Sequence, residues 1–128
     1  ILQLNNVIKN NPETKFVLLH CGFPWVADLF SIVDGYPNLY PDLTWLPILS
    51  YTASKRVMHQ LIEMSQLDKI CWGCDTWTVE ESYGSLLAFR FSLCSVLREK
   101  IEDGYLSVNN AKDIIDKILF DNAGKIYV

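Results

Sequence analysis

The sequence predicts an α/β fold built from parallel βαβ units. Three short apolar runs have the length and composition of buried strands, and a helix-like segment follows each run at intervals of about 25–30 residues. This alternation is typical of a parallel sheet whose strands are joined by crossover helices. No repeat, low-complexity segment or linker interrupts the pattern, so we expect residues 1–128 to form a single unit.

Length and composition restrict the class of protein. The 128 residues suit one domain with a modest core, and 50% of them are apolar. The formal net charge is −4 and the chain has no basic run, so we expect no nucleic acid partner. No apolar stretch approaches the roughly 18 residues that would indicate a membrane span, so we expect no membrane partner. The first residue is Ile1 and not Met, which indicates either a removed start or an internal piece of a longer protein.

The first half of the chain contains two predicted strands. Residues 1–9 have the pattern of a helix end, and "KFVLLH" (15–20) is a short apolar run typical of a buried strand. Apolar residues with helical spacing then predict a helix over 24–33. Residues 38–49 predict a second strand, although Pro41 lacks an N–H for the ladder and fits an edge, a strand start or a bulge.

The second half contains the third predicted strand and two further helices. A helix is predicted over 53–66, and "KICWGCD" (69–75) has the composition of a buried strand. A long helix is predicted over 80–102, ending before Gly104, and Ser107 can cap the helix that follows. These elements fit either an open doubly wound sheet or part of a (β/α)8 barrel, since a complete barrel takes about 250 residues.

Polar residues end two of the predicted strands. Both architectures place their chemistry at the carboxyl ends of parallel strands, where His20 and Asp75 lie in this sequence. A buried carboxylate is costly unless a metal, a cation or hydrogen bonds hold it, so Asp75 is a candidate site residue. The alternative is a structural histidine and a loop cap. The aromatic residues Phe23, Trp45 and Trp77 near these ends could line a pocket, or could simply pack in the core or loops.

The C-x-x-C of "KICWGCDTW" has three interpretations: a redox pair, half of a metal site, or thiols buried in a strand. Alternation along a strand places Cys71 and Cys74 on opposite faces, and the adjacent Asp75 would raise the pKa of a thiol. Cys21 and Cys94 are isolated, so a four-cysteine zinc site lacks its second pair. We therefore expect inert, reduced thiols, which favour a cytoplasmic protein.

Four segments, taken with their order and spacing, carry a family resemblance: "KFVLLHCG", "PNLYPDLTW", "KICWGCDTW" and "LFDNAGKIY". They resemble the C-terminal part of the amidohydrolase superfamily, in the branch that includes aminocarboxymuconate-semialdehyde decarboxylase and several lactone hydrolases. The resemblance spans nearly the whole chain, and Asn122 and Ala123 match the closing motif of that branch. It implies strands six to eight of a TIM (β/α)8 barrel that is incomplete in this chain.

The resemblance also implies a function. His20 corresponds to the strand-six histidine and Asp75 to the strand-eight aspartate, both associated with a divalent metal and with catalysis. The implied protein is a metal-dependent hydrolase or non-oxidative decarboxylase that acts on a small organic substrate through a metal-activated water. Zinc is the expected metal and manganese the alternative. Trp77, Trp45 and Phe23 would contact the substrate.

The sequence departs from the family pattern in several places. Such enzymes take further ligands from an H-x-H on strand one and from strand five, whereas this chain has only two histidines and no H-x-H. The second histidine, His59, lies on a predicted helix, where we expect it to face solvent. Cys74 stands where the family often has serine, and Trp77 changes the usual "DYP" to "DTW".

Two explanations of these departures follow. Either the further ligands belong to a missing N-terminal part of the barrel, or the protein is a degenerate relative. In the first case we expect the isolated chain to be inactive, because two residues cannot supply three or four ligands. We also expect exposed sheet edges, and with them a homo-oligomer or dependence on the missing part. The alternative function is a non-catalytic α/β binding or interaction domain in which His20 and Asp75 are structural.

Overall fold

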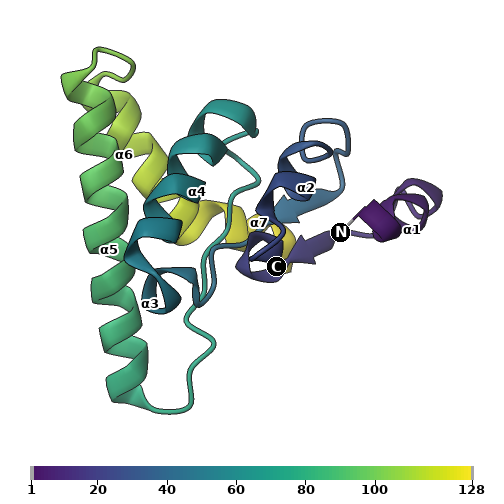
Figure 1. Cartoon of the computed structure of the whole chain (residues 1–128), viewed down its shortest axis with the longest axis horizontal. Coiled ribbons are helices and arrows are strands. Elements are labelled where there is room, and N and C mark those ends of the chain that lie inside the picture. The colour runs from purple at the N-terminus through teal and green to yellow at the C-terminus, as the bar shows by residue number, and fades with distance from the viewer. Residues whose placement is uncertain (1, 128) are drawn as a thin grey trace.

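Two short parallel strands lie among helices in the computed structural model, which describes residues 2–127 (Figure 1). β1 (Phe16–Leu18) pairs in parallel with β2 (Leu39–Pro41). The register sets Phe16, Val17 and Leu18 opposite Leu39, Tyr40 and Pro41. The described chain is therefore a mostly helical α/β structure with a two-stranded parallel sheet.

Helices form most of the remaining structure. Their bounds are η1 Leu2–Leu4, α1 Asn5–Asn10, η2 Leu19–Gly22, α2 Val26–Phe30, α3 Leu46–Leu49, α4 Tyr51–Met64, α5 Val79–Glu102, α6 Val108–Asp116, the π-helical turn η3 Lys117–Asp121 and α7 Asn122–Tyr127. The long helix α5 stands at one edge of the molecule and α1 lies at the opposite end, with α4 beside α5 (Figure 1). None of these helices is long and apolar enough to cross a membrane.

The strand predicted over 38–49 is wrong beyond its first few residues. Pro41 is the last residue of β2, and although it offers no N–H, its carbonyl accepts the N–H of Cys71 at 2.9 Å. The chain then turns at Trp45, whose φ of 63° lies in the left-handed region, and Pro47 sits in the first turn of α3. A left-handed residue followed by a helix-starting proline makes residues 46–49 helical and not extended.

The third predicted strand, 69–75, is reduced to one parallel bridge between Asp42 and Cys71. Two bonds carry it, because the N–H of Leu43 also donates to the carbonyl of Cys71 at 2.9 Å. Beyond this bridge the neighbouring segment leaves for α3, so the end of the third segment has no strand to pair with. The three segments still lie in chain order and run in parallel, as successive βαβ units do.

The predicted long helix is confirmed as α5. Thr78 accepts the N–H of Glu81 and the Glu81 carboxylate accepts the N–H of Thr78, which forms a capping box at its start. Gly104, with a φ of 75°, ends the helix as expected. Ser107 caps α6 through a bond from the N–H of Asn110 at 3.1 Å.

The other predicted helices are present with different bounds. The helix predicted over 53–66 is α4, which begins two residues earlier because the Ser50 hydroxyl caps it. The helix predicted over 24–33 is shortened to α2, and the predicted helix end at 1–9 corresponds to η1 and α1. Ile1 lies outside the described residues.

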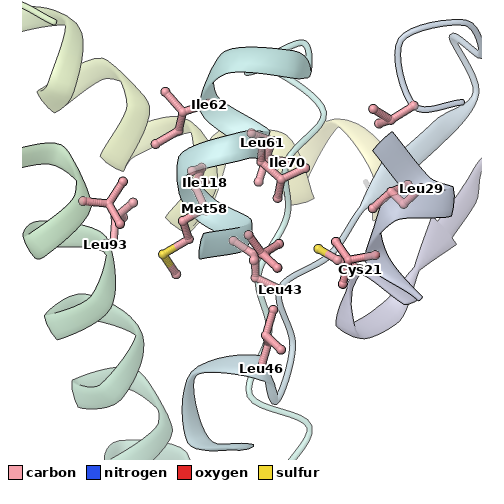
Figure 2. Packing of buried hydrophobic residues seen from close by; sticks show 14 of the residues in the cluster. Cys21, Leu29, Leu43, Leu46, Met58, Leu61, Ile62, Ile70, Leu93 and Ile118 are labelled. Atoms are coloured by element: carbon pink, nitrogen blue, oxygen red, sulfur yellow. The ribbon is translucent and has the colours of Figure 1, made fainter. Parts of the chain in front are cut away.

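Apolar residues from the strands and from α2, α4, α5 and η3 meet in one core. The predicted inward face of α4 is buried throughout: Val57, Met58, Leu61 and Ile62. Figure 2 shows the side chains of Leu43, Leu93 and Ile118 gathered around this face. The indole of Trp72 stacks on the ring of Phe89 with centroids 4.4 Å apart. This stack attaches the third segment to α5 and so fixes the strand end that precedes Asp75.

Asn122 connects the end of the chain to the third segment. Its side chain is fully buried, and its Nδ2 donates to the carbonyls of Leu67 and Ile70, both at 2.8 Å. Leu67 lies just before the third segment and Ile70 belongs to it. The closing motif noted in the sequence therefore has a structural role in this fold.

Replacing Asn122 with alanine should lower the free energy of unfolding by about 1–3 kcal/mol, because two buried carbonyls lose their donor. Urea denaturation followed by circular dichroism measures this. The control is Asn109→Ala, an exposed asparagine on α6, which should change the stability by less than about 0.5 kcal/mol. Equal stability of the two variants would contradict the structural role of Asn122.

Glu99 of α5 joins this helix to α4. Its carboxylate accepts from Lys55 Nζ, from the Ser95 hydroxyl at 3.1 Å and from His59 Nε2 at 3.0 Å. The hydrogen bonds from Lys55 and then His59 lower the pKa of Glu99 from 4.5 to about 2. His59 was expected to face solvent, but it is half-buried in this pair.

A lowered pKa in the folded state means that the charged Glu99 carboxylate stabilises the fold. Its contribution is fully present above about pH 4.5 and is lost as the pH falls toward 2. We expect Glu99→Gln to flatten the fall in stability across this window, measured as the free energy of unfolding at several pH values. Glu102→Gln is the control, since Glu102 has one exposed partner, Arg98, at 3.9 Å. An unchanged acid slope in Glu99→Gln would contradict the assignment.

Candidate functional site

Strained turns follow all three parallel segments. His20 and Cys21 come after β1 with φ of 58° and 51°, Trp45 comes after β2 with φ of 63°, and Asp75 closes the third segment with φ of 47°. Among residues 2–127, these four are the non-glycine residues with positive φ. Each such residue costs about 1–3 kcal/mol, and strain of this kind concentrates at functional sites. Three of the five site residues predicted from the sequence lie at these turns.

A chain of contacts links the three turns. His20 Nδ1 lies 2.8 Å from the carbonyl oxygen of Thr44. The imidazole stacks on the indole of Trp45, with ring centroids 5.5 Å apart and planes inclined by 27°. The indole Nε1 of Trp45 in turn donates to the main-chain carbonyl of Asp75. The structure therefore brings His20 and Asp75 to the same end of the parallel segments, with Trp45 between them.

The bond to Thr44 defines the state of the His20 ring. A carbonyl oxygen only accepts hydrogen bonds, so Nδ1 carries the hydrogen. In the neutral ring the second nitrogen, Nε2, then keeps its lone pair. The residue is half-buried, and no bond to Nε2 is found among the described residues. Nε2 is therefore the atom of His20 that is left to bind a metal or accept a hydrogen bond.

A cavity of about 320 Å³ opens beside Asp75. Trp45 and Trp77 line it together with residues of α3, of the turn and of the first turns of α5: Ile48, Thr76, Glu81, Gly84 and Ser85. Trp77 is 91% exposed, but its main-chain N–H donates to Glu81 Oε2 at 2.9 Å. Two of the three aromatic residues predicted to contact substrate thus border one cavity.

Phe23 does not join this cavity. It follows the His20 turn, where its N–H donates to the carbonyl of His20 at 2.9 Å, and its side chain is 37% exposed. His20 does not line the cavity either, and contacts it only through Trp45. Of the five predicted residues, Asp75, Trp45 and Trp77 line the cavity. His20 lies beside it against Trp45, and Phe23 follows the His20 turn without lining the cavity.

Asp42 was missed in the sequence, although it also follows a strand. The residue is 5% exposed, and its Oδ1 accepts the N–H of Thr44 at 2.7 Å. Its main-chain carbonyl accepts the N–H of Cys21 at 2.8 Å. Asp42 thus holds both the carbonyl that binds His20 and the turn that carries His20. An acid directly after the proline at the end of β2 was the available signal.

The two fully buried cysteines, Cys21 and Cys71, are poor nucleophiles in this fold. Burial and then the charge of Asp42 raise the pKa of Cys71 to about 12 and hold that of Cys21 well above its ordinary value. Cys74 is half-buried, and its Sγ donates to the carbonyl of Ser82 at 3.7 Å. The thiolate is the reactive form, so these values argue against the redox interpretation of the C-x-x-C. The sequence suggested that Asp75 would raise the pKa of a thiol, but the acid that raises the pKa of Cys21 and Cys71 is Asp42.

The described residues hold no group of three or more histidine, cysteine, aspartate or glutamate side chains placed to bind a metal ion. His20 and Asp75 could therefore serve only as part of a larger set of ligands. The remaining ligands would have to come from outside residues 2–127, which is the arrangement expected if further strands complete the sheet.

Comparisons with known proteins show which family and which solved structure this chain is similar to. A family model described as amidohydrolase matches residues 1–128. The crystal structure of a "putative metal-dependent hydrolase" from Lactobacillus casei superposes with a TM-score of 0.83 at 25% identity, over 98% of this chain and 33% of that one. Protein fluG of Emericella nidulans is 27% identical over 126 residues, which are 97% of this chain and 15% of fluG.

The chain thus spans a third of the solved structure and a smaller share of fluG. Its parallel segments and helices match one part of a larger fold, and the family model covers its whole length. The resemblance seen in the four sequence segments is confirmed: this chain belongs to the amidohydrolase family.

Proposed function

We propose that this chain forms the C-terminal part of a metal-dependent hydrolase or decarboxylase. In this proposal β1, β2 and the Cys71 segment are the last three strands of a (β/α)8 barrel. Their parallel order and the share of the Lactobacillus casei structure that the chain covers support this placement. The observation that carries the function is the bond between His20 Nδ1 and the Thr44 carbonyl.

This bond is the one that metal-binding histidines usually make. A histidine that binds a metal through one ring nitrogen generally donates its other N–H to a carbonyl or a carboxylate, which fixes the ring. His20 has this arrangement, with Nε2 left as the ligand atom. The carboxylate of Asp75 is exposed at the same end of the fold, so an imidazole and an acid suited to zinc or manganese are both present. The donor set fits part of a metal site.

A bound metal ion and the residues of this chain would contribute different parts of the chemistry. A bound divalent ion would lower the pKa of a bound water toward neutrality. Asp75 can accept a proton or serve as a ligand, and its position depends on the bond from Trp45 to its main chain. Trp45 and Trp77 provide an apolar surface beside Asp75 for a small organic substrate.

The remaining ligands require further strands. β1 pairs with β2 on one side, and no other strand of residues 2–127 pairs with its second edge. An unpaired parallel edge is a site for another strand. We propose that the N-terminal part of the barrel occupies this edge and supplies the missing ligands. Without it, the isolated chain should be inactive and should self-associate.

The test uses the longer protein that carries the remaining strands, purified without chelator. We expect bound zinc or manganese, and we expect His20→Ala to weaken metal affinity by at least about tenfold. Inductively coupled plasma mass spectrometry after dialysis against buffered metal measures the content. His59→Ala is the matched control, because His59 pairs with Glu99 on the helices and should leave the metal content unchanged. An unaltered protein that binds neither metal would favour a non-catalytic binding domain.

A further inference from the structure

The cavity beside Asp75 combines two indoles with two carboxylates. Asp75 and Glu81 are its acids, and no lysine or arginine among the described residues lines it. We propose that this cavity is a subsite for an organic cation that carries an apolar group, such as an arylalkyl ammonium. The idea that this cation is part of the substrate rests on the proposed function. The binding of the cation to the cavity does not.

The cavity has the size and the completeness of a ligand site. Its volume of about 320 Å³ falls in the usual range for small-molecule pockets, about 300–1,000 Å³. Within residues 2–127, every residue that lines it lies between positions 45 and 85. Binding to this subsite therefore does not need the strands that would complete the barrel.

The indoles supply attraction for a cation. The electron-rich face of tryptophan attracts ammonium groups, and it does so more strongly than the other aromatic side chains. Trp45 is held in place by its stack on His20 and by its bond to the Asp75 carbonyl. The apolar part of a ligand can pack on Trp77 and Ile48 in the same cavity.

Glu81 places a fixed carboxylate in the cavity wall. Its Oε2 accepts the N–H of Trp77 at 2.9 Å and that of Thr78 at 3.3 Å. Both bonds use the same oxygen, and no hydrogen bond to Oε1 is found within residues 2–127. Two main-chain donors therefore hold the group still, while one oxygen is left to accept from a ligand.

The positive end of the α5 helix dipole would by itself attract an anion, but acidic side chains in the first turn already offset it. Glu80 and Glu81 both lie in the first turn of the helix. The N–H of Glu81 is bonded to the Thr78 hydroxyl at 3.2 Å, which completes the capping box. An added anion would meet these two acids and Asp75 at this end of the helix.

A buried hydroxyl in the same wall gives a second indication of a ligand. Ser85 is 1% exposed and lines the cavity, and its hydroxyl oxygen has no hydrogen-bond partner among the described residues. Buried polar groups without a partner are uncommon in folded proteins. The Ser85 oxygen is therefore an acceptor without a donor in a residue of the cavity wall.

The test compares three probes of similar shape: benzylammonium, benzyl alcohol and benzoate. They are titrated at pH 7 into the same longer protein after a chelator has removed its metal, and the indole N–H signals of Trp45 and Trp77 are followed by NMR. We expect benzylammonium to bind about tenfold more tightly than benzyl alcohol, because both probes share the apolar contacts but only the ammonium gains cation–π attraction and the attraction of the carboxylates. Benzoate should bind most weakly.

A matched pair of variants separates the cavity from the overall charge. Glutamine also serves in a capping box, so Glu81→Gln should keep the helix start and lose about threefold or more of the preference for the cation. Glu80→Gln makes the same charge change in the same turn, but Glu80 does not line the cavity, so the preference should persist. Circular dichroism confirms that both variants are folded.

Equal affinities for the three probes, tightest binding of benzoate, or no signal change at millimolar probe would overturn the proposal. An equal effect of the Glu80 and Glu81 variants would also overturn it. The outcome is independent of the metal measurement. A cation preference in a protein that binds no metal overturns the proposed function alone, and a metal-binding protein without the preference overturns only the subsite.

Discussion

The parallel alignment of three chain segments is the constraint on which the rest of the structure depends. Main-chain bonds continue the pairing just past the strands, from Cys21 to the Asp42 carbonyl and from Leu43 to the Cys71 carbonyl. Each segment must then leave the sheet at once to enter its helix. The left-handed turns at His20, Trp45 and Asp75 make this change of direction. The side chains suited to chemistry therefore stand where the backbone is most strained.

The parts of the fold that depend on local sequence could be predicted. The helix α5 and the buried face of α4 follow from apolar residues at helical spacing, and their ends follow from Thr78, Ser50 and Gly104. The shared location of His20 and Asp75 could be predicted for the same reason. Parallel segments have their carboxyl ends together, so finding where each segment ends was sufficient.

Strand length and the cavity could not be predicted, because both depend on neighbours distant in sequence. The third segment has the composition of a long strand, but pairing stops where β2 turns away at Trp45. Nothing in the sequence near Glu81 or Ser85 marks these residues as part of a site. They line the cavity because α5 starts beside the turn that follows Asp75, and that depends on packing such as the stack of Trp72 on Phe89.

Trp45 connects the two halves of the candidate site. One face of its indole stacks on His20, its Nε1 holds the main chain of Asp75, and the residue also lines the cavity. The positions of the imidazole and the carboxylate relative to each other therefore depend on a single side chain. A metal site needs its ligands fixed to within a few tenths of an ångström. In this fold the indole of Trp45 contacts both candidate ligands and also lines the cavity. A ligand that packs on Trp45 would therefore act on the residue that links Asp75 to His20.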